Sequence, residues 1–366
     1  METSEDILAI EDELIVSGKP EKSIFNKILM LLLKLSLAAV IIGWMIYKHH
    51  TTFVDSLKDF NYWWLIPACS CYIFHMWICS WRWYKLAEVL KIKISLLEAT
   101  ALTMKGYFFS LVIPGGAVGG DVAKIGFLTT RAEKGTKAEG IFSVLMDRIV
   151  GMVALFSLAI VVIIMAIPIL MRVETDLIKI NDTMRILGII GLLLLCAAGL
   201  IAMLAIFFHR TLEKIPLVAW LMRQADKRAH GMVGRLTAAI DTYRASWKLL
   251  SWLTLVSIFL VHLNIVLVVY FIIKGLGIDV TSGLAVIAAV TIGNIAGLIP
   301  LTPSGTGIRD VTVSVILIAG GVSSSPTIPL MLTAMILFFD IAAGIFFIFD
   351  PDKRKTSAAK CGVVNK

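Results

Sequence analysis

Residues 113–124 read IPGGAVGGDVAK, a proline and four glycines set inside an apolar part of the chain. Glycines at this density allow backbone turns with positive φ, so a continuous helix is disfavoured here. A related stretch, IPLTPSGTGIRD, occupies residues 299–310. Each stretch has a breaking proline, a small-residue turn, and then an acid and a base at the start of the next apolar segment. The two stretches therefore predict a break in each of two apolar segments.

The composition is that of a polytopic membrane protein. The chain has 366 residues, of which 58% are hydrophobic and 16% charged, and its mean hydropathy is +0.88. Because a bilayer core needs roughly 20 apolar residues per helical span, the chain has room for about six to eight membrane segments. A sizeable soluble catalytic domain is excluded.

Unbroken apolar stretches predict six transmembrane helices of about 20 to 25 residues each. They cover residues 28–47, 62–81, 149–171, 186–208, 249–273 and 327–349. An acidic arm, residues 1–27, precedes them, and a basic tail, residues 351–366, follows. Residues 211–248 predict an amphipathic basic helix that forms a cytoplasmic elbow between two halves.

The basic residues predict how the two broken segments are placed. Because successive spans cross the membrane in opposite directions, the loops and termini fall into two sets. One set holds 25 of the 34 Lys and Arg residues and is assigned to the cytoplasm, while the other holds six. The remaining three, Lys34, Lys105 and Arg309, lie in apolar segments. Segment 96–130 is then flanked by cytoplasmic segments at both ends, and segment 283–321 by outside segments. We predict two opposed re-entrant helical hairpins; two kinked helical pairs that cross fully are the alternative.

The predicted fold is thus all-α, with six transmembrane helices plus two re-entrant hairpins in pseudo-inverted halves, spanning residues 28–350. Both termini are expected to be cytoplasmic. Non-helical backbone at membrane depth survives only where protein or a wet cavity satisfies it, so the hairpin tips should line a cavity.

The hairpin tips supply the candidate headgroup-binding residues. A helix N-terminus preceded by uncovered glycine N–H groups favours a phosphate or a carboxylate, and paired broken helices point to a transporter site. For any single glycine, a tight turn alone is the alternative. The candidates are Gly115, Gly116, Gly119, Gly120, Asp121 and Lys124 in the first tip, and Pro303, Ser304, Gly305, Gly307, Arg309 and Asp310 in the second.

Four further charges fall in or beside apolar stretches. Asp147 and Arg148 open the third predicted span, where they either contribute to the site or extend to the membrane surface. Lys105 and Asp340 lie deeper, where an isolated charge is expensive and often functional. We expect these two to take part in coupling, with pairing between Asp340 and Lys105 or Arg148 as the structural alternative.

Motifs for other chemistries are absent from the sequence. It contains no Walker A motif, zinc-protease motif or nucleophile elbow, and its five cysteines show no metal or redox spacing. We expect buried thiols, and one interhelical hydrogen bond each for His75 and His262. No cofactor, metal or nucleic acid is expected, and the chain is predicted not to be an enzyme.

The two glycine- and proline-rich tips, taken with Asp147-Arg148, resemble the flippase-like transmembrane domain of lysylphosphatidylglycerol synthases. The resemblance covers roughly residues 25–350. It departs from the family's usual pattern at Lys124, where Arg is common, and at Asp147 and Asp310, where Glu is common. The soluble transferase domain of the synthases is not found in this sequence, so a free-standing member is expected.

The resemblance implies a translocase for an anionic or aminoacylated phospholipid, such as a phosphatidylglycerol derivative or a polyprenyl-phosphate lipid. The expected location is the cytoplasmic membrane of a prokaryote, with anionic membrane lipids and a separate lipid synthase as partners. Two alternatives remain: an intramembrane lipid-modifying transferase, which would need a compact nucleophile or base, and an ion-coupled transporter of a small polar solute.

Overall fold

The computed structural model describes residues 58–113, 117–129, 137–174, 181–208, 224, 232–298, 307–322 and 327–348, and the regular elements in these ranges are all helices. The acidic arm, the predicted span at 28–47, most of the elbow and the basic tail lie outside the described residues. So do the tip residues 114–116 and 299–306.

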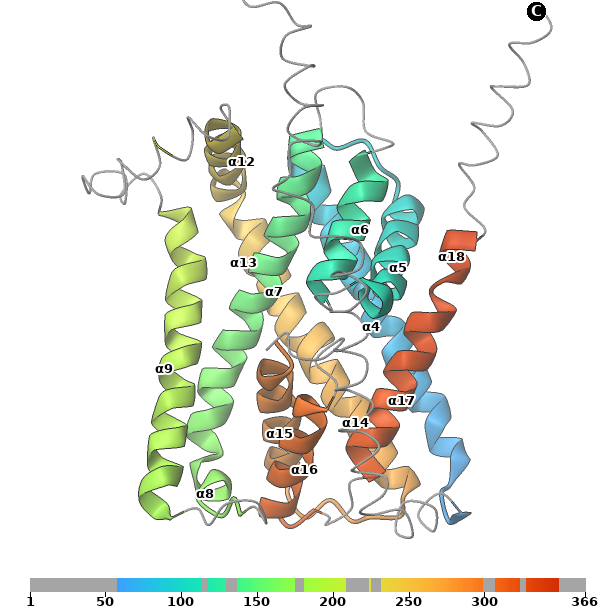
Figure 1. Ribbon diagram of the computed structural model, residues 1–366, viewed down its shortest axis with the longest axis vertical. Coiled ribbons are helices and arrows are strands. Elements are labelled where there is room, and N and C mark those ends of the chain that lie inside the picture. Colours follow the sequence, from blue (N-terminus) through green and yellow to red (C-terminus); the bar gives the residue numbers. More distant parts are fainter. Residues whose placement is uncertain are drawn as a thin grey trace, which may run out of the picture.

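Long helices form the frame of the molecule (Figure 1). Four helical stretches are long and apolar enough to cross a membrane, which makes this an integral membrane protein. They are α7 (Lys137–Met165), α9 (Asp182–Phe207), the continuous stretch of α13 (Trp247–Val256), η2 (Ser257–His262) and α14 (Leu263–Gly275), and the pair α17 (Thr327–Ala342) and α18 (Ile345–Ile348). Helix α4 (Leu65–Val89), which follows the short η1 (Tyr62–Trp64), is as long but less apolar.

Two pairs of shorter helices pack as hairpins. The first pair is α5 (Leu96–Val112) with α6 (Ala117–Thr129), and the second is α15 (Gly283–Ala296) with α16 (Ile308–Ala319). Figure 1 shows the first pair in the upper half of the molecule and the second in the lower half, and the described helices of the two pairs approach each other near mid-height. At about 1.5 Å per residue these helices are roughly 18 to 26 Å long, short of the bilayer core.

Close helix contact in the hairpins depends on glycine. A Cβ added at Gly120 would lie 2.3 Å from the Gly106 carbonyl oxygen, so α5 and α6 meet backbone to backbone at this point. In the second hairpin, a Cβ at Gly293 would lie 2.6 Å from the Val313 side chain. Small residues of this kind allow membrane helices to approach closely.

Helix ends are fixed by local capping. Ser95 and Glu98 form a capping box at the start of α5, with N–O distances of 2.7 and 3.2 Å. At the start of α16, Gly307 has a φ of 88°, and its N–H donates to the Asp310 carboxylate at 3.2 Å. The glycine is needed because this φ is unfavourable for other residues.

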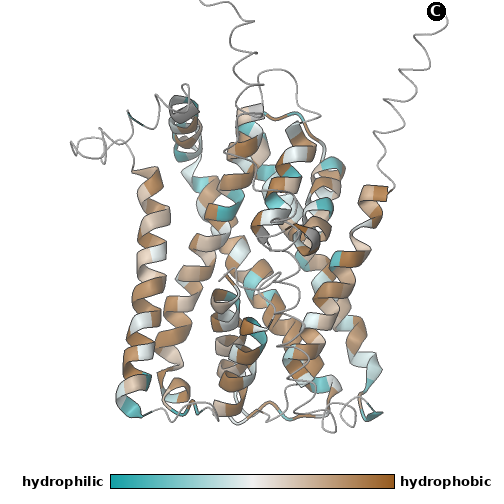
Figure 2. Cartoon of the chain, viewed as in Figure 1, coloured by the Kyte–Doolittle hydropathy of each residue, from teal (hydrophilic) through white to brown (hydrophobic). Residues whose placement is uncertain are grey.

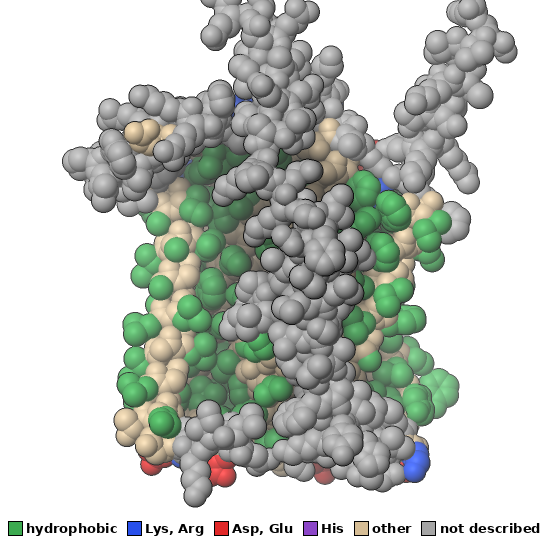
Figure 3. Space-filling view, in the orientation of Figure 1, with side chains coloured by type: hydrophobic (Ala, Val, Ile, Leu, Met, Phe, Trp, Pro, Cys, Tyr) green, Lys and Arg blue, Asp and Glu red, His purple; other side chains and the backbone are tan. Residues whose placement is uncertain are grey.

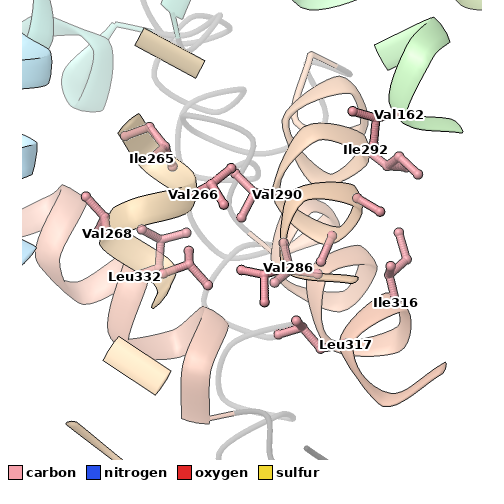
Figure 4. Close-up of a cluster of buried hydrophobic side chains, with 14 of the residues drawn as sticks. Val162, Ile265, Val266, Val268, Val286, Val290, Ile292, Ile316, Leu317 and Leu332 are labelled. Carbon is pink, nitrogen blue, oxygen red and sulfur yellow. The ribbon is translucent and has the colours of Figure 1, made fainter. Parts of the chain in front are cut away.

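The apolar surface faces outward over the long helices, as expected in lipid. Figure 2 shows their bodies as hydrophobic with polar residues toward the ends, and Figure 3 shows hydrophobic side chains over most of the visible described surface. Inside, a large apolar cluster fixes the second hairpin against α7, α14 and α17. Val266 of α14 and Val290 of α15 lie side by side in it (Figure 4).

Two predicted boundaries were wrong, and both errors concern charged residues. Helix α7 begins at Lys137, well before the predicted start at residue 149, so Asp147 and Arg148 lie inside the helix. Helix α4 continues past residue 81 to Val89, so Arg82 is helical and buried instead of lying in a loop. Of the predicted elbow, α12 (Met232–Ala245) is described, and its Tyr243 hydroxyl donates to the Leu86 carbonyl at 3.0 Å.

Candidate functional site: a charged cavity beside the first hairpin

A cavity of about 320 Å³ lies between the first hairpin and helices α4, α7, η2 and α17. This is within the size range of sites for small ligands. Its charged lining residues come from four elements: Arg82 of α4; Asp121 and Lys124 of α6; Asp147 and Arg148 of α7; and Asp340 of α17.

Two ion pairs form part of the cavity wall. Arg82 Nε donates to Asp147 Oδ1 at 2.8 Å, and Arg82 Nη1 donates to Ser257 Oγ at 3.0 Å. Arg148 pairs with Asp121 across the α6–α7 contact. Since Arg82 and Asp147 are only 8% and 15% exposed, this pair is buried and each charge depends on the other.

Lys124 is a buried cation on the hairpin side of the cavity. Its Nζ lies 3.6 Å above the centre of the Trp83 ring, and the residue is 4% exposed. The Trp83 ring is itself fixed, because its Nε1 donates to Ser143 Oγ at 3.2 Å. A ring face stabilises an ammonium without neutralising it, so the Lys124 ammonium contributes a positive group to the cavity wall.

Two polar atoms at the cavity have no hydrogen-bond partner. Asp340 is 3% exposed and its Oδ1 accepts no hydrogen bond in the described structure; Thr103, at 8% exposure, has an unpartnered Oγ1. Both residues line the cavity. Because buried polar groups are almost always hydrogen-bonded, each of these atoms is available to a hydrogen-bonding group inside the cavity.

A histidine and a cysteine share one face of α4. His75 Nδ1 donates to the Val261 carbonyl of η2 at 3.3 Å, while His75 Nε2 lies 3.9 Å from Cys79 Sγ. On the other side of η2, His262 Nε2 donates to the Gly151 carbonyl at 3.2 Å. The predicted interhelical hydrogen bonds of both histidines are thereby confirmed.

The structure gathers some of the sequence-predicted site residues and separates others. Gly120, Asp121, Lys124, Asp147, Arg148 and Asp340 line the cavity. Gly119 instead packs against Ile113. Lys105 is fully buried, with its Nζ 4.9 Å from the Phe127 ring, and is not part of the lining. The tip residues Gly115, Gly116, Pro303, Ser304 and Gly305 lie outside the described residues.

Arg309 and Asp310 form a separate buried network in the second hairpin. Arg309 Nε donates to Asp310 Oδ1 at 3.1 Å, and Arg309 Nη2 donates to the Thr333 hydroxyl of α17. Thr333 in turn donates to Asp310 Oδ2 at 2.7 Å. The two charges hold α16 against α17, and neither is among the residues that line the cavity.

Arg82, His75 and Cys79 were missed as site residues by the sequence analysis. His75, Cys79 and Arg82 stand at positions i, i+4 and i+7 of α4, which places them on one helical face. This spacing was a usable signal. It was hidden because Arg82 follows the predicted end of an apolar stretch and was counted among the loop charges.

Cys79 gives a direct test of the cavity. In a Cys361→Ser background, a small hydrophilic thiol reagent is expected to modify Cys79 faster than Cys196, which is fully buried and not part of the cavity lining. Peptide mass spectrometry of the labelled protein measures both rates. If the total amount of reagent bound per protein is the same in Cys361→Ser and in Cys361→Ser/Cys79→Ser, then the cavity is closed to water-soluble reagents.

No curated protein and no solved structure matches the chain significantly. Within the described residues, no group of three or more His, Cys, Asp or Glu side chains is placed to hold a metal ion. A family model does match: the model described as lysylphosphatidylglycerol synthase TM region covers residues 31–344. The chain therefore belongs to the lysylphosphatidylglycerol synthase transmembrane family, which indicates a role connected with membrane lipids.

Proposed function

We propose that this protein is a lipid translocase that binds a phospholipid headgroup in the charged cavity while the acyl chains stay in the bilayer. The observation that carries the proposal is the cavity, which contains a buried lysine, Lys124, without an ion pair among the described residues. The cavity lies beside the first hairpin, whose helices are shorter than the bilayer core. The substrate is an anionic or aminoacylated phospholipid. Family membership supports the lipid class.

The proposed residue roles follow from the contacts. Lys124 and Arg148 meet the headgroup phosphate, together with backbone N–H groups of the first tip. Asp121 and Asp147 orient the basic side chains through their ion pairs. Arg309 and Asp310, through Thr333, keep the second hairpin in place and do not touch the headgroup.

In the proposed topology, the two hairpins are re-entrant from opposite faces of a prokaryotic cytoplasmic membrane, and both chain termini are cytoplasmic. Two observations support this arrangement. The hairpin helices are short, and the two hairpins lie in opposite halves of the molecule in Figure 1. Translocation then proceeds past two broken segments that meet near mid-membrane, as in transporters built on discontinuous helices.

The topology predicts a labelling pattern. Cysteines placed at Glu98 and Thr129, the two ends of the first hairpin, are expected to react with an impermeant reagent from the same membrane side. A cysteine at Asp279, before the second hairpin, is expected to react from the other side. Labelling of the first two positions from opposite sides would instead mean that α5 and α6 cross the membrane fully.

Leaflet exchange tests the function directly. The purified protein is reconstituted into vesicles that contain labelled phosphatidylglycerol, aminoacylated phosphatidylglycerol or polyprenyl-phosphate lipid, and exchange between leaflets is followed by quenching from outside. Wild type is expected to accelerate exchange of at least one of these lipids relative to empty vesicles. No acceleration for any of them would refute a translocase for anionic and aminoacylated lipids.

One observation favours a second candidate, the intramembrane lipid-modifying transferase. Such an enzyme needs a nucleophile with a base, and His75 and Cys79 supply a compact pair at the cavity, oriented by the Val261 carbonyl. Mass spectrometry of the vesicle lipids separates the two functions. A translocase leaves the lipids chemically unchanged and tolerates Cys79→Ser, whereas a transferase produces a new lipid species that disappears in this variant.

A further inference from the structure

We infer that the cavity selects a zwitterionic headgroup, a phosphate joined by a short linker to a primary ammonium, over a purely anionic one. In this assignment Lys124 binds the phosphate and Asp340 binds the ammonium. The inference rests on the proposed function for one point only, namely that a lipid carries the headgroup. It goes beyond that function by naming the charge pattern of the headgroup and the residue, Asp340, that recognises its ammonium group.

The charges of the cavity wall balance. Among the described lining residues, three are basic and three acidic. Arg82 is paired with Asp147, and Arg148 with Asp121. Two charged groups remain that form no ion pair within 4.0 Å among the described residues. One is the Lys124 ammonium, which lies 3.6 Å above a ring face, and the other is the Asp340 carboxylate, whose Oδ1 has no hydrogen-bond partner. A ligand that complements both remaining groups carries one charge of each sign.

Asp340 is not neutralised by a neighbouring residue in the described structure. One candidate is Arg309 on the neighbouring α16, but its Nε and Nη2 are directed to Asp310 and Thr333, and no ion pair joins it to Asp340 within 4.0 Å. The other candidate, His75, is bonded to the Val261 carbonyl and faces Cys79. A carboxylate buried at membrane depth without a partner is costly, so it is the natural place for a ligand's cation.

The surroundings of Asp340 favour a primary ammonium. An –NH₃⁺ group has three donors and no acceptor, which matches the two unpartnered oxygens, Asp340 Oδ1 and Thr103 Oγ1. The rings of Tyr72 and Tyr107 also line the cavity, and aromatic faces attract cations. A quaternary ammonium has no N–H to donate, so it would leave both oxygens unsatisfied.

An anionic headgroup fits this cavity less well. Its phosphate would meet Lys124, but its neutral hydroxyls would leave the Asp340 carboxylate without a counter-charge. The expected order of preference is therefore an ethanolamine-type headgroup first, and choline-type and glycerol-type headgroups after it.

The test compares matched headgroups in one preparation of the full-length protein. Leaflet exchange is measured in vesicles with labelled phosphatidylethanolamine, phosphatidylcholine or phosphatidylglycerol, and binding of soluble phosphoethanolamine, phosphocholine or glycerol phosphate is measured by calorimetry. The ethanolamine forms are expected to be preferred by about tenfold or more, the value of one charged hydrogen bond. Asp340→Asn is expected to remove this preference while leaving glycerol-type headgroups unaffected.

Two controls separate recognition from folding. Asp340→Asn removes an unpaired buried charge, so its apparent melting temperature is expected to equal or exceed that of wild type. Asp340→Glu keeps the carboxylate and is expected to retain part of the ethanolamine preference. Asp279→Asn, which lies away from the cavity lining, is expected to change neither headgroup preference nor stability.

The outcomes distinguish this inference from the proposed function. Equal exchange of all three lipids, or an unchanged preference in Asp340→Asn, overturns the zwitterion inference and leaves lipid translocation standing. No exchange of any lipid, with tight binding of soluble phosphoethanolamine that Asp340→Asn weakens, supports the ammonium site but assigns it to a free solute. No exchange and no binding overturn both.

Discussion

Replacing Arg82 with Met is expected to destabilise the protein by about 3 to 5 kcal/mol, because breaking a buried pair leaves an uncompensated charge. The partner left behind, Asp147, is 15% exposed and lies inside α7. Arg82 also donates to Ser257 of η2, so the change removes a contact between three helices. The measurement is the apparent melting temperature of purified protein in detergent, which is expected to fall sharply.

The double variant Arg82→Met/Asp147→Leu supplies the decisive comparison. Removing both charges abolishes the unpaired carboxylate, so most of the lost stability is expected to return. Arg185→Met is a matched control, since Arg185 pairs with Glu174 and Asp182, both highly exposed, and such surface pairs contribute less than about 1 kcal/mol. If the double variant is no more stable than Arg82→Met, then the ion pair is not what Arg82 contributes.

Replacing Lys124 with Met is expected to abolish headgroup-dependent lipid exchange while the protein remains folded. Met keeps an unbranched chain that still packs on the Trp83 ring, but the only buried lining cation without an ion pair in the described structure is lost. Losing a charge-assisted contact to phosphate costs about 1.5 to 3 kcal/mol, or roughly 10- to 150-fold in affinity. Leaflet exchange and headgroup binding measure the loss.

The control for this prediction is Lys124→Arg, which keeps the positive charge. It is expected to retain exchange. Lys85→Met, on the same molecular end but paired with Glu88 at the surface at 2.8 Å, is expected to behave as wild type. Full exchange activity in Lys124→Met would remove Lys124 from the headgroup site and with it the main support for the translocase.

Local sequence signals predicted much of the architecture. The prolines and glycines of 113–124 and 299–310 correctly indicated where two apolar segments are interrupted, and the structure has a helix pair around each. Helix ends were harder to predict. Arg82 looked like the first residue of a loop, since a basic residue after an apolar stretch commonly marks a membrane boundary; in the structure α4 continues through it.

The candidate site was predicted only in part. Asp340 was selected because an isolated charge among apolar residues is expensive, and Lys124 because it follows the glycines of the first tip; both line the cavity. The reasoning from the tips also selected Arg309, which the structure instead pairs with Asp310 and Thr333 in a closed network. A sequence pattern can identify a candidate charge, but it does not reveal whether a neighbouring side chain already neutralises that charge.

The sequence by itself determined much of what each segment could do: which stretches are apolar enough to lie in lipid, where two of them break, and which charges stand among apolar residues. These properties follow from short-range chemistry, from hydropathy over about twenty residues and from the backbone freedom of glycine. Tertiary structure alone decided the partners. Arg82 reaches Asp147 across 65 residues and Arg148 reaches Asp121 across 27. Helix packing made those pairs, and so left Lys124 and Asp340 to face the cavity.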